Sequence, residues 1–150
     1  MKELCCALSG HREIPQNFDK NSLYDALEEL IKEGYTYFCC GMARGFDLMA
    51  LECLVELKQR YHVRIEACIP YAGQAAGFSA AEKRNYRNLL AWCDEKTVLF
   101  EEYTRGCLLA RNRYMVDKAD LVFSYCVREK GGTAYTVRYA NEHGVPVKRF

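Results

Sequence analysis

The stretch FCCGMARGFDLMALECL, residues 38–54, begins as an apolar strand and continues with apolar residues at the spacing of one helix face. The change of period falls between Gly41 and Gly45, and Asp47 follows directly inside the helical part. A strand that turns through glycines into a helix is typical of βαβ units with parallel strands. The stretch therefore predicts an α/β fold and raises the question of what Gly41, Gly45 and Asp47 are needed for.

The rest of the chain repeats this alternation from end to end. Strands are predicted at 4–8, 37–40, 63–69, 97–100, 121–126 and 145–149, and helices at 21–34, 46–61, 79–92, 106–118 and 133–143. Ser79 and Glu82 have the spacing of a capping box at the start of the third helix. Alternating strands and helices predict a Rossmann-like, doubly wound, mostly parallel sheet with helices on both faces. We expect one such domain over residues 1–150, because no repeat or linker divides the chain.

Composition excludes several classes of protein. The chain has 150 residues, of which 50% are hydrophobic and 27% are charged, which is typical of a globular protein. Its net charge of +1 gives no overall field to hold a polyanion, so a nucleic-acid role would need a local basic patch. No apolar run is long enough for a membrane span, and the N-terminal residues do not form a signal peptide. We expect a cytoplasmic protein without a membrane partner.

The nine cysteines include two adjacent pairs, Cys5-Cys6 and Cys39-Cys40, inside strand-like apolar runs, and the chain has no CxxC. Adjacent strand residues face opposite sides of a sheet, which suits packing better than shared metal ligation. We interpret the cysteines as small buried hydrophobic residues in a reducing compartment, with redox or metal chemistry as the alternative. No metal site and no cofactor is expected.

Four loops should meet at the carboxyl edge of the predicted sheet, where ligands bind in such folds. They carry SGHR, GMARGFD, YAGQ and KGGT, and Arg111 begins a helix that faces the same edge. The residues predicted to bind a ligand are Ser9, Gly10, His11, Arg12, Gly41, Met42, Ala43, Gly45, Asp47, Tyr71, Gln74, Arg111, Gly131, Gly132 and Thr133.

Each of these residues has a purely structural alternative. The glycines can cradle an anion against free helix amides, or they can merely permit a tight turn, and Asp47 can merely complement a helix dipole. His11 can act as an acid or base, or it can be a hydrogen-bonding turn residue. Neither glycine loop is a Walker loop or a GxGxxG motif. Two glycine loops at one edge, with arginines nearby, favour ligand binding.

Five motifs in order, GHR, GMA.G.D, IPY..Q, RN..MV and GGT, resemble the YpsA-like branch of the SLOG superfamily. This Rossmann-like superfamily also includes the DNA-processing DprA proteins and the LOG-type phosphoribohydrolases. The resemblance covers nearly the whole chain. It implies a nucleotide-type ligand held by Gly41, Ala43, Gly45 and Asp47 on one side and by residues 131–133 on the other.

The resemblance leaves three functions open. The first is a regulatory module that senses a nucleotide or nucleotide derivative, and this is our main expectation. The second is a LOG-like N-glycosidase with Asp47 as its acid, although Gly131-Gly132-Thr133 lacks the preceding proline and the following glutamate of the LOG loop. The third is DprA-like binding of single-stranded DNA through Arg111 and Arg113, which the balanced charge disfavours. A homo-oligomer is expected, and a protein partner is possible.

Overall fold

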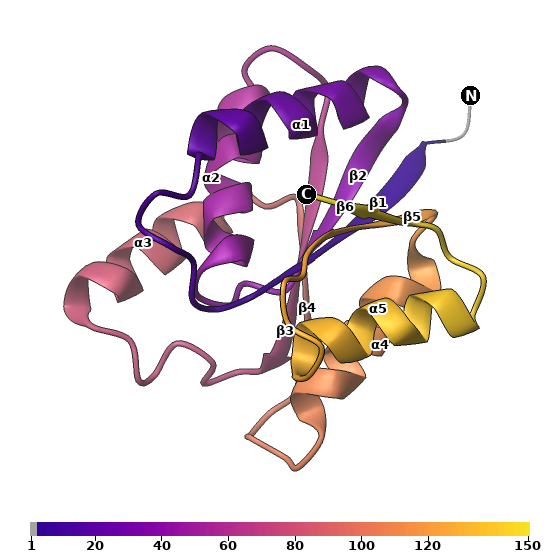
Figure 1. The fold of residues 1–150 in the computed structure, drawn as a ribbon. Helices are drawn as coiled ribbons and strands as arrows, with labels where there is room; N and C mark the ends of the chain where they lie inside the picture. Colours follow the sequence, from indigo (N-terminus) through magenta and orange to yellow (C-terminus); the bar gives the residue numbers. More distant parts are fainter. Residues whose placement is uncertain (1–2) are drawn as a thin grey trace.

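The computed structural model describes residues 3–150 and contains a six-stranded, all-parallel sheet with five helices (Figure 1). The strands are β1 (Leu4–Gly10), β2 (Tyr35–Cys40), β3 (Arg64–Tyr71), β4 (Glu95–Phe100), β5 (Leu121–Tyr125) and β6 (Val147–Arg149). The helices are α1 (Lys20–Lys32), α2 (Phe46–Leu57), α3 (Ala80–Ala91), α4 (Cys107–Lys118) and α5 (Gly132–Glu142). The predicted Rossmann-like fold, with its strictly alternating elements, is confirmed.

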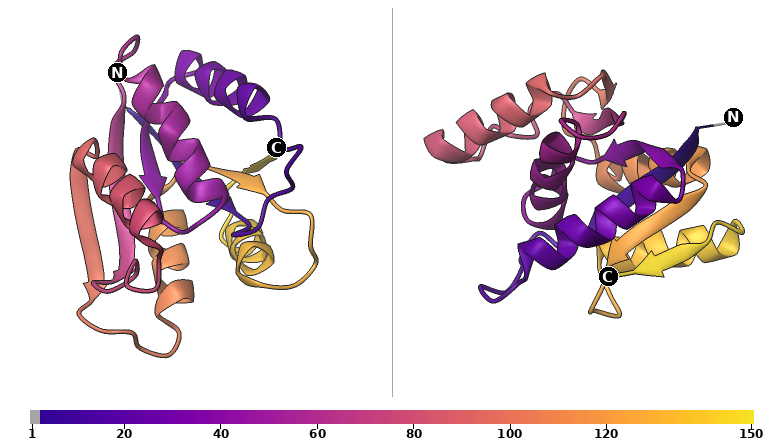
Figure 2. Two further views of the ribbon diagram at one scale, coloured as in Figure 1. Left: turned by 90° about the vertical axis from the view of Figure 1, so that its left-hand side faces the viewer. Right: turned by 90° about the horizontal axis from the view of Figure 1, so that it is seen from above.

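The helices cover the two faces of the sheet in separate groups. Figures 1 and 2 show α1, α2 and α3 on one face and α4 and α5 on the other. Strands β1 and β2 contribute alternate residues to both faces. Cys6 and Cys40 belong to the core beneath α1 and α2, whereas Cys5 and Cys39 belong to the core beneath α4 and α5. All nine cysteines are free thiols and seven of them are buried, as expected for small core residues.

The strand order β4-β3-β2-β1-β5-β6 places a topological switch point between β1 and β5. The chain moves outward from β1 through β2 and β3 to β4, and α4 then returns it across the sheet to β5 on the other side of β1. The connections after β1 and β5 therefore leave the sheet in opposite directions. In open α/β sheets this opens a crevice at the carboxyl ends of the two strands.

Element boundaries differ from the predicted ones by a few residues. Strand β3 runs through Pro70 to Tyr71 instead of ending at Ile69. Its pairing with β2 ends at Ala67, while its pairing with β4 continues to Tyr71, so Pro70 lies where one side of β3 has no strand neighbour to receive an N–H. The capping box of Ser79 and Glu82 is present at α3. No helix within residues 3–150 is long and apolar enough to span a membrane.

Candidate functional site

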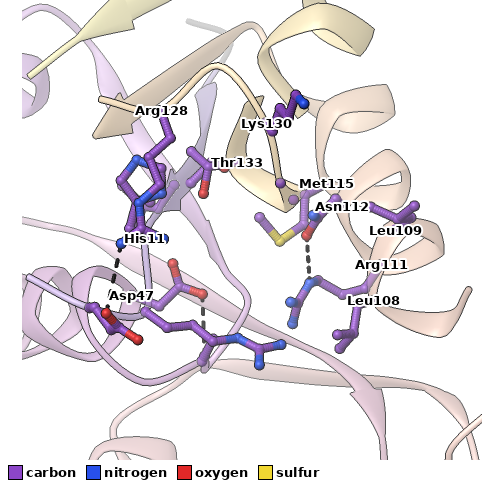
Figure 3. A pocket seen from close by; sticks show the side chains of 18 residues that line it. His11, Asp47, Leu108, Leu109, Arg111, Asn112, Met115, Arg128, Lys130 and Thr133 are labelled. Atoms are coloured by element: carbon purple, nitrogen blue, oxygen red, sulfur yellow. Dashed lines mark hydrogen bonds and ion pairs between the residues drawn. The ribbon is translucent and has the colours of Figure 1, made fainter. Parts of the chain in front are cut away.

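A cavity of about 400 Å³ lies at the switch point (Figure 3). The connections that follow β1 and β5, the start of α2, and α4 contribute its walls. Figure 3 shows Arg111, Asn112 and Met115 projecting from α4 on one side, opposite His11 and Asp47. Elements far apart in sequence thus meet at the position that the topology favours for a ligand.

Many of the predicted residues are brought together here. Those that line the cavity are Ser9, Gly10, His11, Arg12, Ala43, Asp47, Arg111, Gly131, Gly132 and Thr133. Tyr71 and Gln74 instead line a neighbouring cavity that shares Arg12 and Ala43 with the first. Gly41, Met42 and Gly45 line neither of these two cavities.

The glycines of the first loop are surrounded by protein. A Cβ on Gly45 would lie 2.2 Å from the carbonyl oxygen of Arg12, and Gly45 has a φ of +81°. A Cβ on Gly41 would lie 2.7 Å from the Arg111 guanidinium and 2.9 Å from Asp47 Oδ2. These two glycines are therefore required for the close packing of the loops after β1 and β2 and of α4. Met42, with a φ of 62°, is buried in the core.

The glycines of the second loop, Gly131 and Gly132, have free space around them. Gly131 has a φ of +102°, a Cβ added to it would have no neighbour within 4 Å, and the nearest atom to a Cβ on Gly132 would be 3.9 Å away. Gly131 is the N-cap of α5 without a side-chain cap, so the first amides of α5 have no intrahelical or capping partner. Within residues 3–150 the hydroxyls of Ser9 and Thr133 have no hydrogen-bond partner either. This end of the cavity can donate several hydrogen bonds to an anion.

The charged side chains that line the cavity also favour an anion. Four basic side chains, from Arg12, Arg111, Arg128 and Lys130, line it together with two acidic ones, from Glu13 and Asp47. Arg128 and Lys130 lie in the loop that leads into α5 and are exposed. The excess of positive charge and the positive end of the α5 dipole both favour a negatively charged ligand.

Arg111 is buried and holds α4 to the carboxyl ends of two strands. Its Nη1 donates to the carbonyls of Gly41 and Cys68, the second at 3.2 Å, and its Nε donates to Asn112 Oδ1 at 2.9 Å. A guanidinium engaged in this way is fixed in position. Arg111 therefore positions the cavity wall, and contributes its charge to the cavity from that fixed place.

Asp47 is 6% exposed and lines the cavity from the first turn of α2. Its Oδ2 accepts one hydrogen bond, from the backbone N–H of Ala43 at 3.2 Å. Burial raises the pKa of Asp47 to about 6, although the nearby Arg111 guanidinium, the Ala43 amide and Arg12 oppose this rise. Asp47 is thus a carboxylate with unused acceptor capacity that can exchange a proton near neutral pH.

His11 has a structural bond as well as a place in the cavity wall. Its Nε2 accepts from the backbone N–H of Val127 at 2.9 Å, which ties the connection after β1 to the loop that carries Arg128 and Lys130. Burial, followed by the charge of Arg128, lowers the pKa of His11. A neutral imidazole is the form that accepts this bond, so His11 fixes the loop that carries Arg128 and Lys130.

The side-chain amide of Gln74 makes hydrogen bonds through both its nitrogen and its oxygen. Its amide nitrogen donates to the carbonyl of Gly41 at 3.0 Å, and its amide oxygen accepts from Tyr86 Oη at 3.0 Å. The YAGQ segment therefore holds the turn after β2 through the same Gly41 carbonyl that accepts from Arg111. Gln74 is a support for the site in this structure.

One group of potential metal ligands lies elsewhere, beneath α4. The ligand atoms of Cys39, Glu66 and Cys68 lie within 4.8 Å of one another and are buried. The Glu66 carboxylate already accepts hydrogen bonds from Tyr37, Thr97, Tyr114 and Lys118. Its lone pairs are thus committed to protein donors, and the group is better explained as a packed polar core than as a metal centre.

Several site residues were not singled out from the sequence. Lys130 precedes the predicted glycines directly, so a basic residue next to a glycine-rich helix start was an available signal. Asn112 belongs to the RN..MV motif, which was an available signal, whereas Leu108 lines the cavity because α4 crosses the sheet, and no local pattern indicates that crossing. The aromatic Tyr103 lies in the neighbouring cavity for the same reason.

The fold and this cavity define a Rossmann-like α/β domain with a ligand-type cavity at its switch point. Within that class, the YpsA family model, described as the YspA SLOG family, matches residues 8–146. The chain therefore belongs to the YpsA SLOG family, which confirms the resemblance seen in the sequence motifs.

Two related sequences differ in how much of their length the chain spans. The chain is 28% identical over 137 residues to the uncharacterized SPbeta prophage-derived protein YoqJ of Bacillus subtilis, covering 82% of this chain and 80% of YoqJ. It is 25% identical over 105 residues to the UPF0398 protein OB1025 of Oceanobacillus iheyensis, covering 69% of this chain and 57% of that protein. The chain thus spans little more than half of the second relative.

Solved structures share the fold at low identity. DNA processing protein A from Helicobacter pylori, described for its single-stranded DNA binding mode, matches 98% of this chain and 65% of its own length, with a TM-score of 0.71 and 22% identity. DNA processing protein A from Streptococcus pneumoniae matches 97% of this chain and 50% of its own length, with a TM-score of 0.69 and 20% identity. The protein TM1055 matches 96% of this chain and 72% of its own length, with a TM-score of 0.60 and 16% identity.

Proposed function

We propose that this chain binds a nucleotide or nucleotide derivative in the switch-point cavity and acts as a sensor or regulatory module. The observation that carries the proposal is the open start of α5 inside the cavity. The first amides of α5 have no side-chain cap, and Lys130, Gly131, Gly132 and Thr133 all line the cavity at this point. This combination of helix amides and a cation is suited to a phosphate group.

The opposite side of the cavity has the complementary chemistry. Asp47 offers free carboxylate lone pairs, which accept hydrogen bonds from hydroxyl groups and repel phosphate. A ligand with an anionic end and a hydroxylated part therefore fits better than a bare anion. A sugar phosphate, such as the ribose phosphate of a nucleotide, has both parts, with ribose hydroxyls directed at Asp47.

The first test is thermal unfolding of the purified protein against a panel of nucleotides, dinucleotides and ADP-ribose-like compounds. A ligand at about 100 times its dissociation constant stabilises the native state by about 2.7 kcal/mol, so a binder raises Tm by several degrees. Lys130→Ala should reduce the shift, because it removes a cation from the cavity. Lys148→Ala, an exposed lysine on β6, is the matched control and should keep the full shift.

Absence of any shift across the panel would contradict nucleotide binding. An equal loss in both lysine variants would contradict the assignment of the phosphate to the α5 end. Gly45 is not a suitable target in this test, because its substitution would disturb packing that the structure requires.

A second candidate, an N-glycosidase, is favoured by one specific observation: the raised pKa of Asp47, about 6, inside the cavity. A carboxyl group that titrates near neutral pH is suited to general acid catalysis at a glycosidic bond. The same panel distinguishes the two functions, since release of free base from a nucleotide indicates turnover. Turnover that persists in Asp47→Asn would exclude Asp47 as the acid.

A further inference from the structure

The neighbouring cavity, of about 360 Å³, has a different chemistry from the first. It lies beyond Arg12, Ala43 and Leu108, which line both cavities. Its walls carry three aromatic rings, from Tyr71, Phe78 and Tyr103. The first cavity has no aromatic ring other than the imidazole of His11 among its lining residues within 3–150. Aromatic ring surface is thus concentrated in the second cavity, which also carries two cationic side chains, Arg12 and Arg44.

The rings of this second cavity contact one another or a neighbouring cation. Tyr71 and Tyr103 meet edge to face, with ring centroids 5.4 Å apart and an interplanar angle of 90°. The Arg44 guanidinium lies 4.4 Å from the centre of the Phe78 ring and is itself held by Glu82 and by the Gly77 carbonyl. Phe78, which also contacts Tyr86, is already positioned and loses little conformational entropy when a flat molecule binds.

Tyr103 shows that the ring surface is open. It is 64% exposed, which is unusual for a large aromatic side chain, and it lies in the loop between β4 and α4. An exposed aromatic ring beside a cavity offers a face on which a planar heteroaromatic group can stack. Within residues 3–150, Tyr71 is the one aromatic ring that Tyr103 contacts.

We infer that the second cavity binds the base of the nucleotide whose phosphate binds at the start of α5. This inference rests on the proposed function and adds the direction of the ligand. The ligand crosses the shared wall, with its base among Tyr71, Phe78 and Tyr103 and its ribose near Asp47. Arg12, which is exposed and lines both cavities, lies at the shared wall where the ligand would pass.

The test compares two probes of different composition on the same variants. Isothermal titration measures the dissociation constants of ribose 5-phosphate and of the four common ribonucleoside 5′-diphosphates, and the tightest-binding nucleotide is carried forward. Tyr103→Ala should weaken binding of that nucleotide by about tenfold, the scale of one lost base–aromatic stack. It should leave ribose 5-phosphate affinity unchanged, since that probe has no base.

Three further variants serve as controls. Tyr103→Phe keeps the ring and should bind the nucleotide like the wild type. Trp92→Ala removes another exposed aromatic ring that lines neither cavity, and it should have no effect. Lys130→Ala should weaken both probes, because it acts on the shared phosphate end.

The possible results separate this inference from the function on which it rests. If Tyr103→Ala binds the nucleotide like the wild type while Lys130→Ala weakens it, the base lies elsewhere and only the inference is overturned. If Tyr103→Ala weakens both probes equally, Tyr103 acts through the loop and the inference is also wrong. If neither probe binds the wild-type protein at all, the proposed function itself fails.

Discussion

Two carboxylates, Glu66 and Asp47, are buried, the first beneath α4 and the second in the first turn of α2. They differ in how many hydrogen bonds they accept from the protein. Glu66 accepts hydrogen bonds from three hydroxyl groups and from the Lys118 ammonium. Asp47 accepts one backbone N–H, and Arg111 nearby donates to carbonyl oxygens instead. Both side chains lose water on folding, and only one recovers its hydrogen bonds from the protein.

The pKa values follow from this difference. Burial would raise the pKa of Glu66, but the donors from Lys118, Tyr114, Tyr37 and Thr97 lower it to about 2. For Asp47 burial prevails and the pKa rises to about 6. A saturated buried carboxylate supports the fold, whereas an unsaturated one that faces a cavity is available to a ligand. The comparison therefore assigns Glu66 to structure and supports the proposal that Asp47 contacts the ligand.

The largest expected effect is on Glu66. Glu66→Ala should lower the free energy of unfolding by about 3–5 kcal/mol, because the Lys118 charge and three hydroxyls lose their acceptor in a buried place. Urea denaturation at pH 7 measures the change. Glu95→Ala is the matched control: Glu95 also accepts from Tyr37 and pairs with Arg64, but its side chain is 46% exposed. It should cost less than about 1 kcal/mol, and a similar small cost for Glu66→Ala would remove Glu66 from its structural role.

Asp47→Asn should raise the free energy of unfolding, whereas Glu66→Ala should lower it. A rise in pKa from 3.8 to about 6, a difference of about 2, means that the ionised carboxylate opposes folding by up to about 3 kcal/mol at neutral pH. The amide keeps an oxygen for the Ala43 N–H and carries no charge. The variant should therefore be about 1–3 kcal/mol more stable than the wild type in urea denaturation at pH 8, while it binds the ligand more weakly.

The pH dependence gives an independent check of the same substitution. Because the native state binds the Asp47 proton more tightly than the unfolded state does, its stabilising contribution is complete below pH 4 and is lost as pH rises through 6. The difference between Asp47→Asn and the wild type should thus shrink when both are measured at pH 5. A variant that is less stable than the wild type at pH 8 would place Asp47 in the same structural class as Glu66.

The sequence predicted the fold well, because the alternation of strands and helices is a local pattern. It predicted the switch-point residues for the same reason, since the carboxyl ends of parallel strands must share an edge. It could not distinguish the two glycine loops. Gly45 is needed because the carbonyl of Arg12 lies against it, and Gly131 has open space around it, and both facts depend on packing between distant segments.

Glu66 is an instructive omission. It lies within the apolar run VRIEACI, where an acidic residue at a fully buried position needs partners, so the run itself contained a signal. Its partners come from β2, β4 and α4, and no spacing in the sequence identifies them. Polar groups inside buried strands therefore require the tertiary structure before a role can be assigned.

The smallest expected effect tests whether each hydrogen-bond donor to Glu66 contributes to lowering its pKa. Tyr114→Phe removes one hydroxyl that donates to Glu66 at 2.6 Å and keeps the ring. It should cost about 1 kcal/mol at pH 7 and raise the pKa of Glu66, measured by the carboxyl carbon shift in an NMR titration. Nucleotide affinity should not change, because Tyr114 lines neither cavity. An unchanged Glu66 pKa would mean that the other donors hold the charge without Tyr114. Weaker nucleotide binding would mean that Glu66 and the cavity are coupled through α4.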